Sequence, residues 1–195
     1  MISHKHKFIL VRVAKTASTS IIESLPKSTL CCENWKYDCN HVPLWHLKQN
    51  LDKDIIDTYF KFAFVRNPFE RVVSVVKYLN KWYRENGVNK QFEFKEFVSL
   101  LYDISTSILP DTTDSSKYGS QYDFTKGCDF IGRLENLQQD FNTVCDKIGI
   151  PRKELPHRNK TNHKHYTEYY DNETLDMVAT IYAKDIKYFG YKFGE

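Results

Sequence analysis

Two short segments of the chain place a cation beside hydroxyl groups, and each follows directly on an apolar run. In residues 13–20, Lys15 precedes several hydroxyl-bearing side chains, and in residues 65–74, Arg66 precedes Ser74 by eight positions. The hydroxyls of the first segment belong to Thr16, Ser18, Thr19 and Ser20. Where a strand gives way to a helix, unpaired backbone N–H groups and the positive end of the helix dipole face a bound anion. Two such junctions predict a ligand with two separate anionic groups.

The side chains at both junctions suit phosphate or sulfate groups. Lys15 is a flexible point charge that can reach a terminal anion. Ser74 lies about two helical turns beyond Arg66 and off the apolar stripe of the following helix, so both can contact one phosphate. The first segment is not a Walker A loop, because it contains no glycine and its lysine precedes the hydroxyl run. Each segment alone also allows a plainer interpretation, a solvated lysine in a polar turn or an arginine in a structural ion pair.

Apolar runs and helical spacing alternate along the chain. Residues 8–14 and 62–65 are almost wholly apolar, which is typical of strands that are covered on both faces of a parallel sheet. After the second run, Asn67 can cap a helix that has Pro68 at its first position and Glu70 in its first turn. This alternation favours an α/β fold, a parallel sheet with helices on both faces.

The other predicted elements are shorter or have less certain ends. Residues 128–131 are predicted to form a short strand, and residues 110–126, rich in Asp, Thr, Ser and Gly, a surface excursion. In the helix after the first strand, Ser20 and Glu23 match a capping pattern, and Pro26 keeps the helix short. A start a few residues before Ser20 is left open. Further helices are predicted over residues 92–108, 134–148 and 172–182.

Length and composition favour one globular unit. The chain has 195 residues, which predicts a single domain over residues 1–195, and its 41% hydrophobic and 15% aromatic content excludes a disordered class. The net charge is +3, with basic residues scattered among 25 acidic ones, so we expect no nucleic-acid partner. No apolar stretch has the length of a membrane span, and we expect none. The oligomeric state is left open.

The two charged segments resemble motifs of the sulfotransferases that use 3′-phosphoadenosine-5′-phosphosulfate (PAPS), in particular the carbohydrate type and its bacterial relatives. Residues 15–20 are similar to the 5′-phosphosulfate loop of this family, especially that of heparan sulfate and uronyl 2-O-sulfotransferases, and residues 66–74 to its 3′-phosphate motif. Residues 129–137 and 182–191 extend the likeness over nearly the whole chain, although Ala14 stands where the family usually has proline. The resemblance implies a P-loop-NTPase-like fold.

The resemblance also assigns the residues that hold the nucleotide. Lys15 and the residues after it would hold the 5′-phosphosulfate, and Arg66 and Ser74 the 3′-phosphate. The residues after Lys15 are Thr16, Ala17, Ser18, Thr19 and Ser20. A later polar loop at residues 158–161 aligns loosely with one that closes over the nucleotide, and within it Lys160 receives a supporting role.

Transfer to a hydroxyl also needs a base, and histidine has the pKa best suited to take a proton near neutrality. His41 and His46 both lie between the two charged segments. His41, followed by Val42, is more similar to the Gly-His-Val catalytic segment of the family. His41 is therefore the predicted base, and His46 is the alternative.

The reaction that the resemblance implies is an in-line displacement of the sulfuryl group of PAPS by a hydroxyl, expected to be that of a carbohydrate. His41 would remove the proton and Lys15 would stabilise the departing nucleotide. We predict no Mg²⁺, because a sulfuryl group carries one negative charge and positioned cations can assist its transfer. Two other classes stay open. A P-loop-like nucleotide kinase would need metal ligands and a Walker loop, and a catalytically silent nucleotide- or glycan-binding module would need no base.

The cysteines bear on the compartment and on metal binding. The chain has five of them, an odd number that cannot pair completely within one chain, and a core of this size does not need disulfides. We therefore expect reduced thiols and a cytoplasmic location, with the luminal catalytic domain of a truncated Golgi-type enzyme as the alternative. A zinc site is conceivable from four residues that could be ligands, Cys31, Cys32, Cys39 and His41. Adjacent cysteines are poorly spaced for tetrahedral ligation, so we predict no metal.

Overall fold

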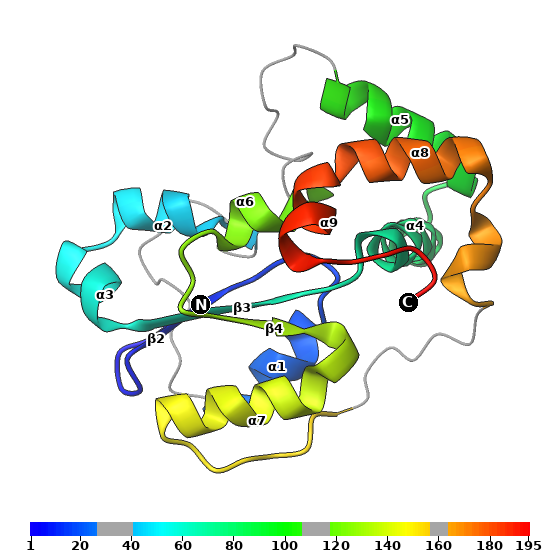
Figure 1. The fold of residues 1–195 in the computed structure, drawn as a ribbon. Coiled ribbons are helices and arrows are strands. Elements are labelled where there is room, and N and C mark those ends of the chain that lie inside the picture. The colour runs from blue at the N-terminus through cyan, green and yellow to red at the C-terminus, as the bar shows by residue number, and fades with distance from the viewer. Residues whose placement is uncertain (27–40, 107–117, 157–163) are drawn as a thin grey trace. The chain divides into compact units, whose positions relative to one another are not determined.

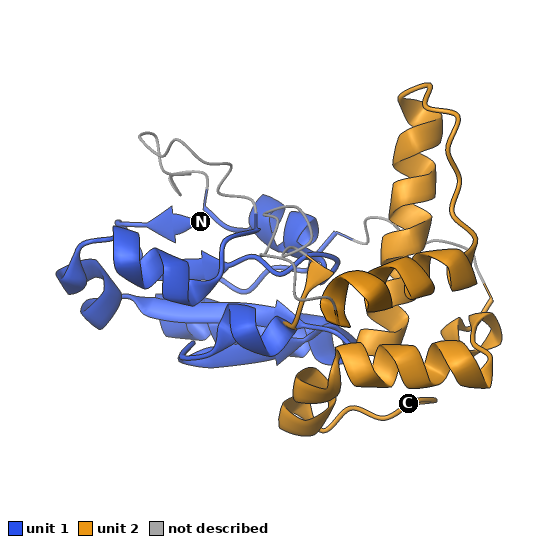
Figure 2. Ribbon diagram, turned by 90° about the horizontal axis from the view of Figure 1, so that it is seen from above, with its two compact units in different colours: residues 1–66, 121–160 blue, residues 67–120, 161–195 orange. Residues whose placement is uncertain are grey.

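The computed structural model describes residues 1–26, 41–106, 118–156 and 164–195. The chain divides into two compact units (Figure 2). The first comprises Met1–Arg66 and Gln121–Lys160, and the second comprises Asn67–Ser120 and Thr161–Glu195. A single domain over residues 1–195 stays a prediction.

The first unit is built on a sheet with strand order β1-β2-β3-β4. The strands are β1 (Ile2–Ser3), β2 (Phe8–Val11), β3 (Phe60–Val65) and β4 (Phe130–Arg133). β1 pairs antiparallel with β2, whereas β2, β3 and β4 run parallel, with Val11 opposite Ala63 and Val65 opposite Arg133. The carboxyl ends of the three parallel strands therefore lie at the same edge of the sheet (Figure 1).

Helices of the first unit cover both faces of this sheet. They are α1 (Ser18–Ser24), α2 (Leu44–Asn50), α3 (Lys53–Thr58), α6 (Gln121–Thr125) and α7 (Leu137–Ile148). Phe8 and Phe62 point to the face where α1 and α7 pack, and Ile9 and Ala63 point to the face where α2 and α3 pack. Figure 1 shows α1 and α7 on one side of the strands and α2 on the other. The predicted α/β fold, a mostly parallel sheet flanked by helices, is confirmed.

The first helix begins earlier than the capping pattern predicts. α1 starts at Ser18, and its N-cap residue is Ala17 in the left-handed conformation. Ser20 lies inside the helix and is buried, so Ser20 and Glu23 do not form its cap, and the earlier start that the sequence left open is the one found. The reason is that the loop turns sharply at Ala17 and enters the helix without an extended capping residue. The helix ends at Ser24, before Pro26, as the proline predicts.

The second unit is helical among the residues that the structure describes. Its elements are α4 (Pro68–Glu85), α5 (Phe94–Thr106), the 3₁₀ helix η4 (Tyr166–Tyr169), α8 (Asn172–Ile181) and α9 (Ala183–Phe189). α4 begins as predicted, with Pro68 as its first residue and the Asn67 side chain accepting a hydrogen bond from the Phe69 N–H at 3.1 Å. The apolar stripe of α4 packs in one core with residues of α5 and α8, among them Val98 and Val178.

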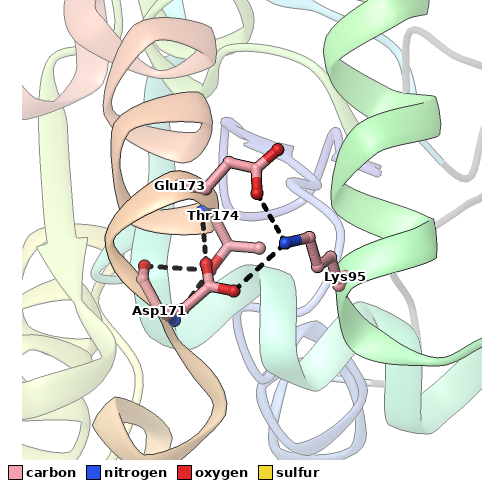
Figure 3. A network of polar contacts seen from close by, with 4 residues as sticks. All are labelled: Lys95, Asp171, Glu173 and Thr174. Carbon is pink, nitrogen blue, oxygen red and sulfur yellow. Dashed lines mark hydrogen bonds and ion pairs between the residues drawn. The ribbon is translucent and has the colours of Figure 1, made fainter.

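A polar network on the surface of the second unit ties α5 to the start of α8 (Figure 3). The Lys95 Nζ donates to Glu173 at 2.5 Å and to Asp171 at 3.4 Å. Asp171 also caps α8, because its Oδ1 accepts from the Thr174 N–H at 2.8 Å. This hydrogen bond from the Thr174 backbone is the main reason that the pKa of Asp171 is lowered.

Several elements differ from the sequence predictions. β4 begins two residues later than expected, at Phe130, and α2 and α3 were not predicted. The described part of residues 110–126 is not all surface excursion, because α6 lies within it and buries Gln121, Phe124 and Thr125. These three side chains follow the i, i+3, i+4 spacing of a helix, a signal that the polar composition around them obscured. The helices predicted over residues 92–108, 134–148 and 172–182 correspond to α5, α7 and α8.

Candidate active site

The loop after β2 has a backbone shape suited to an anion. Lys15 has φ of 68° and Ala17 has φ of 58°, values that residues with a Cβ atom seldom adopt. When residues in the left-handed conformation alternate with residues in the right-handed conformation, successive backbone N–H groups point to the same side. The N–H groups then line a concave surface that can bind a phosphate. Thr16 between them is buried, and its Oγ1 donates to the Val13 C=O at 3.0 Å, which closes the turn. Residues that hold such strained conformations concentrate at binding sites.

The hydroxyls of this loop divide into two groups. Thr16 and Ser20 are buried, whereas Ser18 is half-buried and Thr19 is exposed. Because α1 has only seven residues, the attraction for an anion depends on the loop N–H groups and on Lys15 rather than on a long helix dipole. Ser18 and Thr19 are thus the hydroxyls with access to a ligand from solvent, and Thr16 serves to fix the turn.

Arg66 is the first residue after β3, next to the loop that follows β2. Its Nη1 donates to the Lys15 C=O at 3.4 Å. The guanidinium therefore reaches from the end of one strand to the loop at the end of its parallel neighbour. The structure therefore brings the Arg66 side chain to the backbone of Lys15, two residues that the sequence placed at separate strand-helix junctions.

The other predicted nucleotide ligands are placed differently. Ser74 is half-buried on α4 of the second unit, whereas Arg66 ends the first unit. Lys160 lies outside the described residues, as does the rest of the polar loop at residues 158–161. Their contacts to a nucleotide stay predictions from the motif resemblance.

His41, the predicted base, lies beside the first residue after β2. Its Nδ1 is 3.1 Å from the Arg12 C=O. A carbonyl oxygen can only accept, so this hydrogen bond requires the proton on Nδ1 and leaves the lone pair of the neutral ring on Nε2. In this tautomer Nε2 is the ring nitrogen that can accept a proton as a general base. His46 lies on α2 with its ring edge-on to Trp45.

One residue that positions this site was missed by the sequence analysis. Gln121, at the start of α6, is 0% exposed and hydrogen-bonds to the backbone of Arg66. It stands in the segment predicted to be a surface excursion, where a polar residue carries no signal of burial. Its spacing from Phe124 and Thr125 is the only hint in the sequence.

The described cysteines lie away from these cations or in the core. Cys128 precedes β4, so it is at the amino end of the strands, and burial raises its pKa to about 12. Burial also raises the pKa of Cys145, and neither thiol forms a disulfide. Within residues 1–26, 41–106, 118–156 and 164–195, no three His, Cys, Asp or Glu side chains gather into a metal site. Cys31, Cys32 and Cys39, the other candidate zinc ligands, lie outside those ranges.

A mostly parallel sheet flanked by helices, with charged loops at the carboxyl ends of its parallel strands, defines an α/β protein, a class whose ligands generally bind at that edge of the sheet. The chain belongs to the sulfotransferase family, whose family model matches residues 1–192. Among the described residues, no helix is both long enough and apolar enough to cross a bilayer.

Three relatives illustrate the family membership. Carbohydrate sulfotransferase 9 of Homo sapiens is 26% identical over 230 residues, which cover 95% of this chain and 47% of the relative. Carbohydrate sulfotransferase 11 of Mus musculus is 25% identical over 170 residues, 70% of this chain and 48% of the relative. An uncharacterised protein of Archaeoglobus fulgidus is 34% identical over 110 residues, 56% of this chain and 84% of that protein. The chain thus matches about half the length of each named sulfotransferase.

Proposed function

We propose that this chain transfers the sulfuryl group of PAPS to a hydroxyl group of a carbohydrate. The observation that carries the proposal is the contact between Arg66 and the Lys15 backbone at the ends of two parallel strands. Two cations held there can bind one ligand that is anionic at two points, as PAPS is at its 5′-phosphosulfate and its 3′-phosphate. Membership of the sulfotransferase family supports sulfuryl transfer, and the names of two relatives support a carbohydrate acceptor.

The 5′ end of the donor is assigned to the loop after β2. Lys15, the loop N–H groups around Ala17, and the accessible hydroxyls of Ser18 and Thr19 would hold the phosphosulfate. Thr16 would act chiefly by closing the turn, and Ser20 through the first turn of α1. The preformed loop shape fits this role, because it presents its donors without first paying the entropy of ordering.

The 3′-phosphate is assigned to Arg66. A guanidinium presents several donors in a fixed fork, which suits a phosphate better than a point charge does. Ser74 and Lys160 join this assignment through the motif resemblance alone.

The chemical step is assigned to His41 and Lys15. The Nε2 of His41 takes the proton of the acceptor hydroxyl while the acceptor oxygen forms a bond to sulfur. The bond from sulfur to the phosphate oxygen breaks, and its electron pair stays on that oxygen, where the Lys15 cation stabilises the new charge. The proton then leaves His41 to solvent, and the carbohydrate sulfate and 3′-phosphoadenosine-5′-phosphate (PAP) depart. The Arg12 C=O keeps the ring oriented and stabilises the imidazolium through the Nδ1 hydrogen bond.

Calorimetric titration with PAP, ADP and ATP with Mg²⁺ separates this proposal from the kinase alternative. We expect PAP to bind at least about tenfold more tightly than ADP, because only PAP carries a phosphate for Arg66. A preference for ATP with Mg²⁺ would refute the proposal and favour a nucleotide kinase.

A transfer assay with radiolabelled PAPS and a panel of desulfated glycosaminoglycans separates the proposal from a catalytically silent module. We expect His41→Ala to lower the rate by at least about 100-fold while PAP affinity is unchanged. His46→Ala is the matched control and should keep the wild-type rate. Undiminished turnover in His41→Ala rejects the base assignment, and wild-type chain that binds PAP but sulfates no acceptor on the panel favours the silent module.

The compartment stays a prediction. It rests on the cysteine count of the sequence, which favours reduced thiols.

A further inference from the structure

The buried side chain of Gln121 binds both polar backbone groups of Arg66. Its Oε1 accepts from the Arg66 N–H at 3.0 Å, and its Nε2 donates to the Arg66 C=O at 2.8 Å. Only one orientation of the amide pairs both groups, because oxygen can only accept and the NH₂ can only donate. Gln121 is 0% exposed, so water does not replace either hydrogen bond.

These two hydrogen bonds replace the pairing between β3 and its neighbouring strands, which ends before Arg66. The last pair between β3 and β4 is Val65 with Arg133, and β2 already ends at Val11 opposite Ala63. Arg66 is the next residue of the chain, where a backbone without a neighbouring strand would need other partners. The amide of Gln121 supplies one acceptor and one donor, as a residue on an adjacent strand does.

The position of the Arg66 backbone decides where its guanidinium lies. The side chain reaches the Lys15 C=O at 3.4 Å, so it is directed toward the loop that follows β2. A shift or rotation of the Arg66 peptide would be carried to the end of this long side chain, and small misplacements of a binding group are costly. Within α6, the Thr125 Oγ1 donates to the Gln121 C=O at 2.8 Å, a hydrogen bond that does not involve Arg66.

We propose that Gln121 is a positioning residue for the phosphate-binding arginine: its amide holds the Arg66 backbone so that the guanidinium meets the 3′-phosphate of the donor. The inference rests on the proposed function, which assigns that phosphate to Arg66. A glutamine suits this role because it is uncharged and pairs with both backbone groups. Glutamate would accept but not donate, and its charge would repel the phosphate, whereas asparagine is one methylene shorter.

The test compares PAP with adenosine 5′-phosphate, which lacks the 3′-phosphate. Gln121→Met keeps the length and volume of the side chain but removes both hydrogen bonds. We expect the variant to bind PAP about tenfold more weakly than wild type and to bind adenosine 5′-phosphate as wild type does. In the transfer assay the same variant should raise KM for PAPS by a similar factor with kcat nearly unchanged.

Thr125→Val is the matched control, because it removes a buried hydrogen bond from the same helix without touching Arg66. It should lower the melting temperature but leave the ratio of the two affinities at the wild-type value. If Gln121→Met is too unstable to measure, Gln121→Asn replaces it, because its uncharged amide is one methylene too short to pair with both Arg66 groups, and we expect the same selective loss of PAP affinity.

The outcomes distinguish this inference from the proposed function. If wild-type chain prefers PAP and Gln121→Met keeps the same preference, or loses affinity for both nucleotides equally, the role of Gln121 is refuted and the proposed function stands. If wild-type chain binds PAP no more tightly than adenosine 5′-phosphate, the 3′-phosphate assignment to Arg66 fails, and the role of Gln121 fails with it.

Discussion

Replacing Ala17 with glycine should stabilise the chain, because Ala17 has φ of 58° in the loop after β2. A residue with a Cβ atom in this conformation costs about 1–2 kcal/mol relative to an ordinary conformation. Glycine avoids most of that cost but loses about 0.5–1 kcal/mol through the greater freedom of its unfolded state. The difference predicts a net gain of about 0.5–1 kcal/mol for Ala17→Gly.

For a chain of this length, 1 kcal/mol corresponds to a change in Tm of about 2–4 °C. We therefore expect Ala17→Gly to raise Tm by about 1–4 °C in differential scanning calorimetry. Gly149→Ala is the matched control with the opposite sign: Gly149 has φ of 68°, and an added Cβ would have no other atom within 4 Å. It should lose stability through its backbone conformation alone.

A fall in Tm for Ala17→Gly, together with the expected fall for Gly149→Ala, would contradict the left-handed conformation of the loop. The basis for a preformed anion site after β2 would then be removed, because the alternation around Ala17 is what turns the backbone N–H groups to one side.

Three further predictions concern stability and reactivity. Gly132→Ala should destabilise the fold by about 1–3 kcal/mol, because a Cβ there would lie 2.5 Å from Cε1 of Phe64. Urea unfolding measures this loss, and an unchanged unfolding midpoint would contradict the close packing of Gly132 against Phe64. Asp171 has a lowered pKa, so its contribution to stability is present above its unfolded pKa and is lost as the pH falls through the folded value. Asp171→Asn keeps a capping acceptor but does not titrate, so its Tm should fall less than that of wild type between about pH 5 and about pH 3, and equal losses would contradict the assignment. Cys128 is half-buried, and desolvation raises its pKa to about 12, so it should resist iodoacetamide near neutral pH until the chain unfolds. Mass spectrometry that finds it labelled in the native chain at the unfolded rate would contradict the raised pKa.

Buried strands and a strongly capped helix were predictable from local sequence. Phe62 to Val65 is an unbroken apolar run, and Asn67 with Pro68 marks a helix start whose side-chain cap and first residue the structure contains. Such features depend on neighbouring residues alone, which is why periodicity and capping patterns detect them.

The start of α1 and the burial of α6 were not predictable in this way. Ala17 adopts a left-handed conformation that alanine disfavours by itself, so the surrounding loop must impose it. Gln121 is buried because a backbone 55 residues earlier in the chain needs its amide. Both depend on contacts that the sequence pattern does not reveal.

The sequence predicted which residues form the candidate site but not the contacts that they make. The sequence placed Lys15 and Arg66 after separate strands, but their contact depends on the pairing of β2 with β3, which no local pattern specifies. For His41, the resemblance to the sulfotransferase motif predicted a base. The hydrogen bond to the Arg12 C=O then indicates that Nδ1 carries the proton and that Nε2 carries the lone pair.

We propose that one ligand is held at both of its anionic ends by the loops after β2 and β3. A calorimetric comparison of PAP with adenosine 5′-phosphate and adenosine 3′-phosphate on wild-type chain tests this two-point binding. We predict that PAP binds at least about tenfold more tightly than either monophosphate, because each of them leaves one of the two cations without its phosphate. Equal affinity for PAP and one of the monophosphates would contradict the claim.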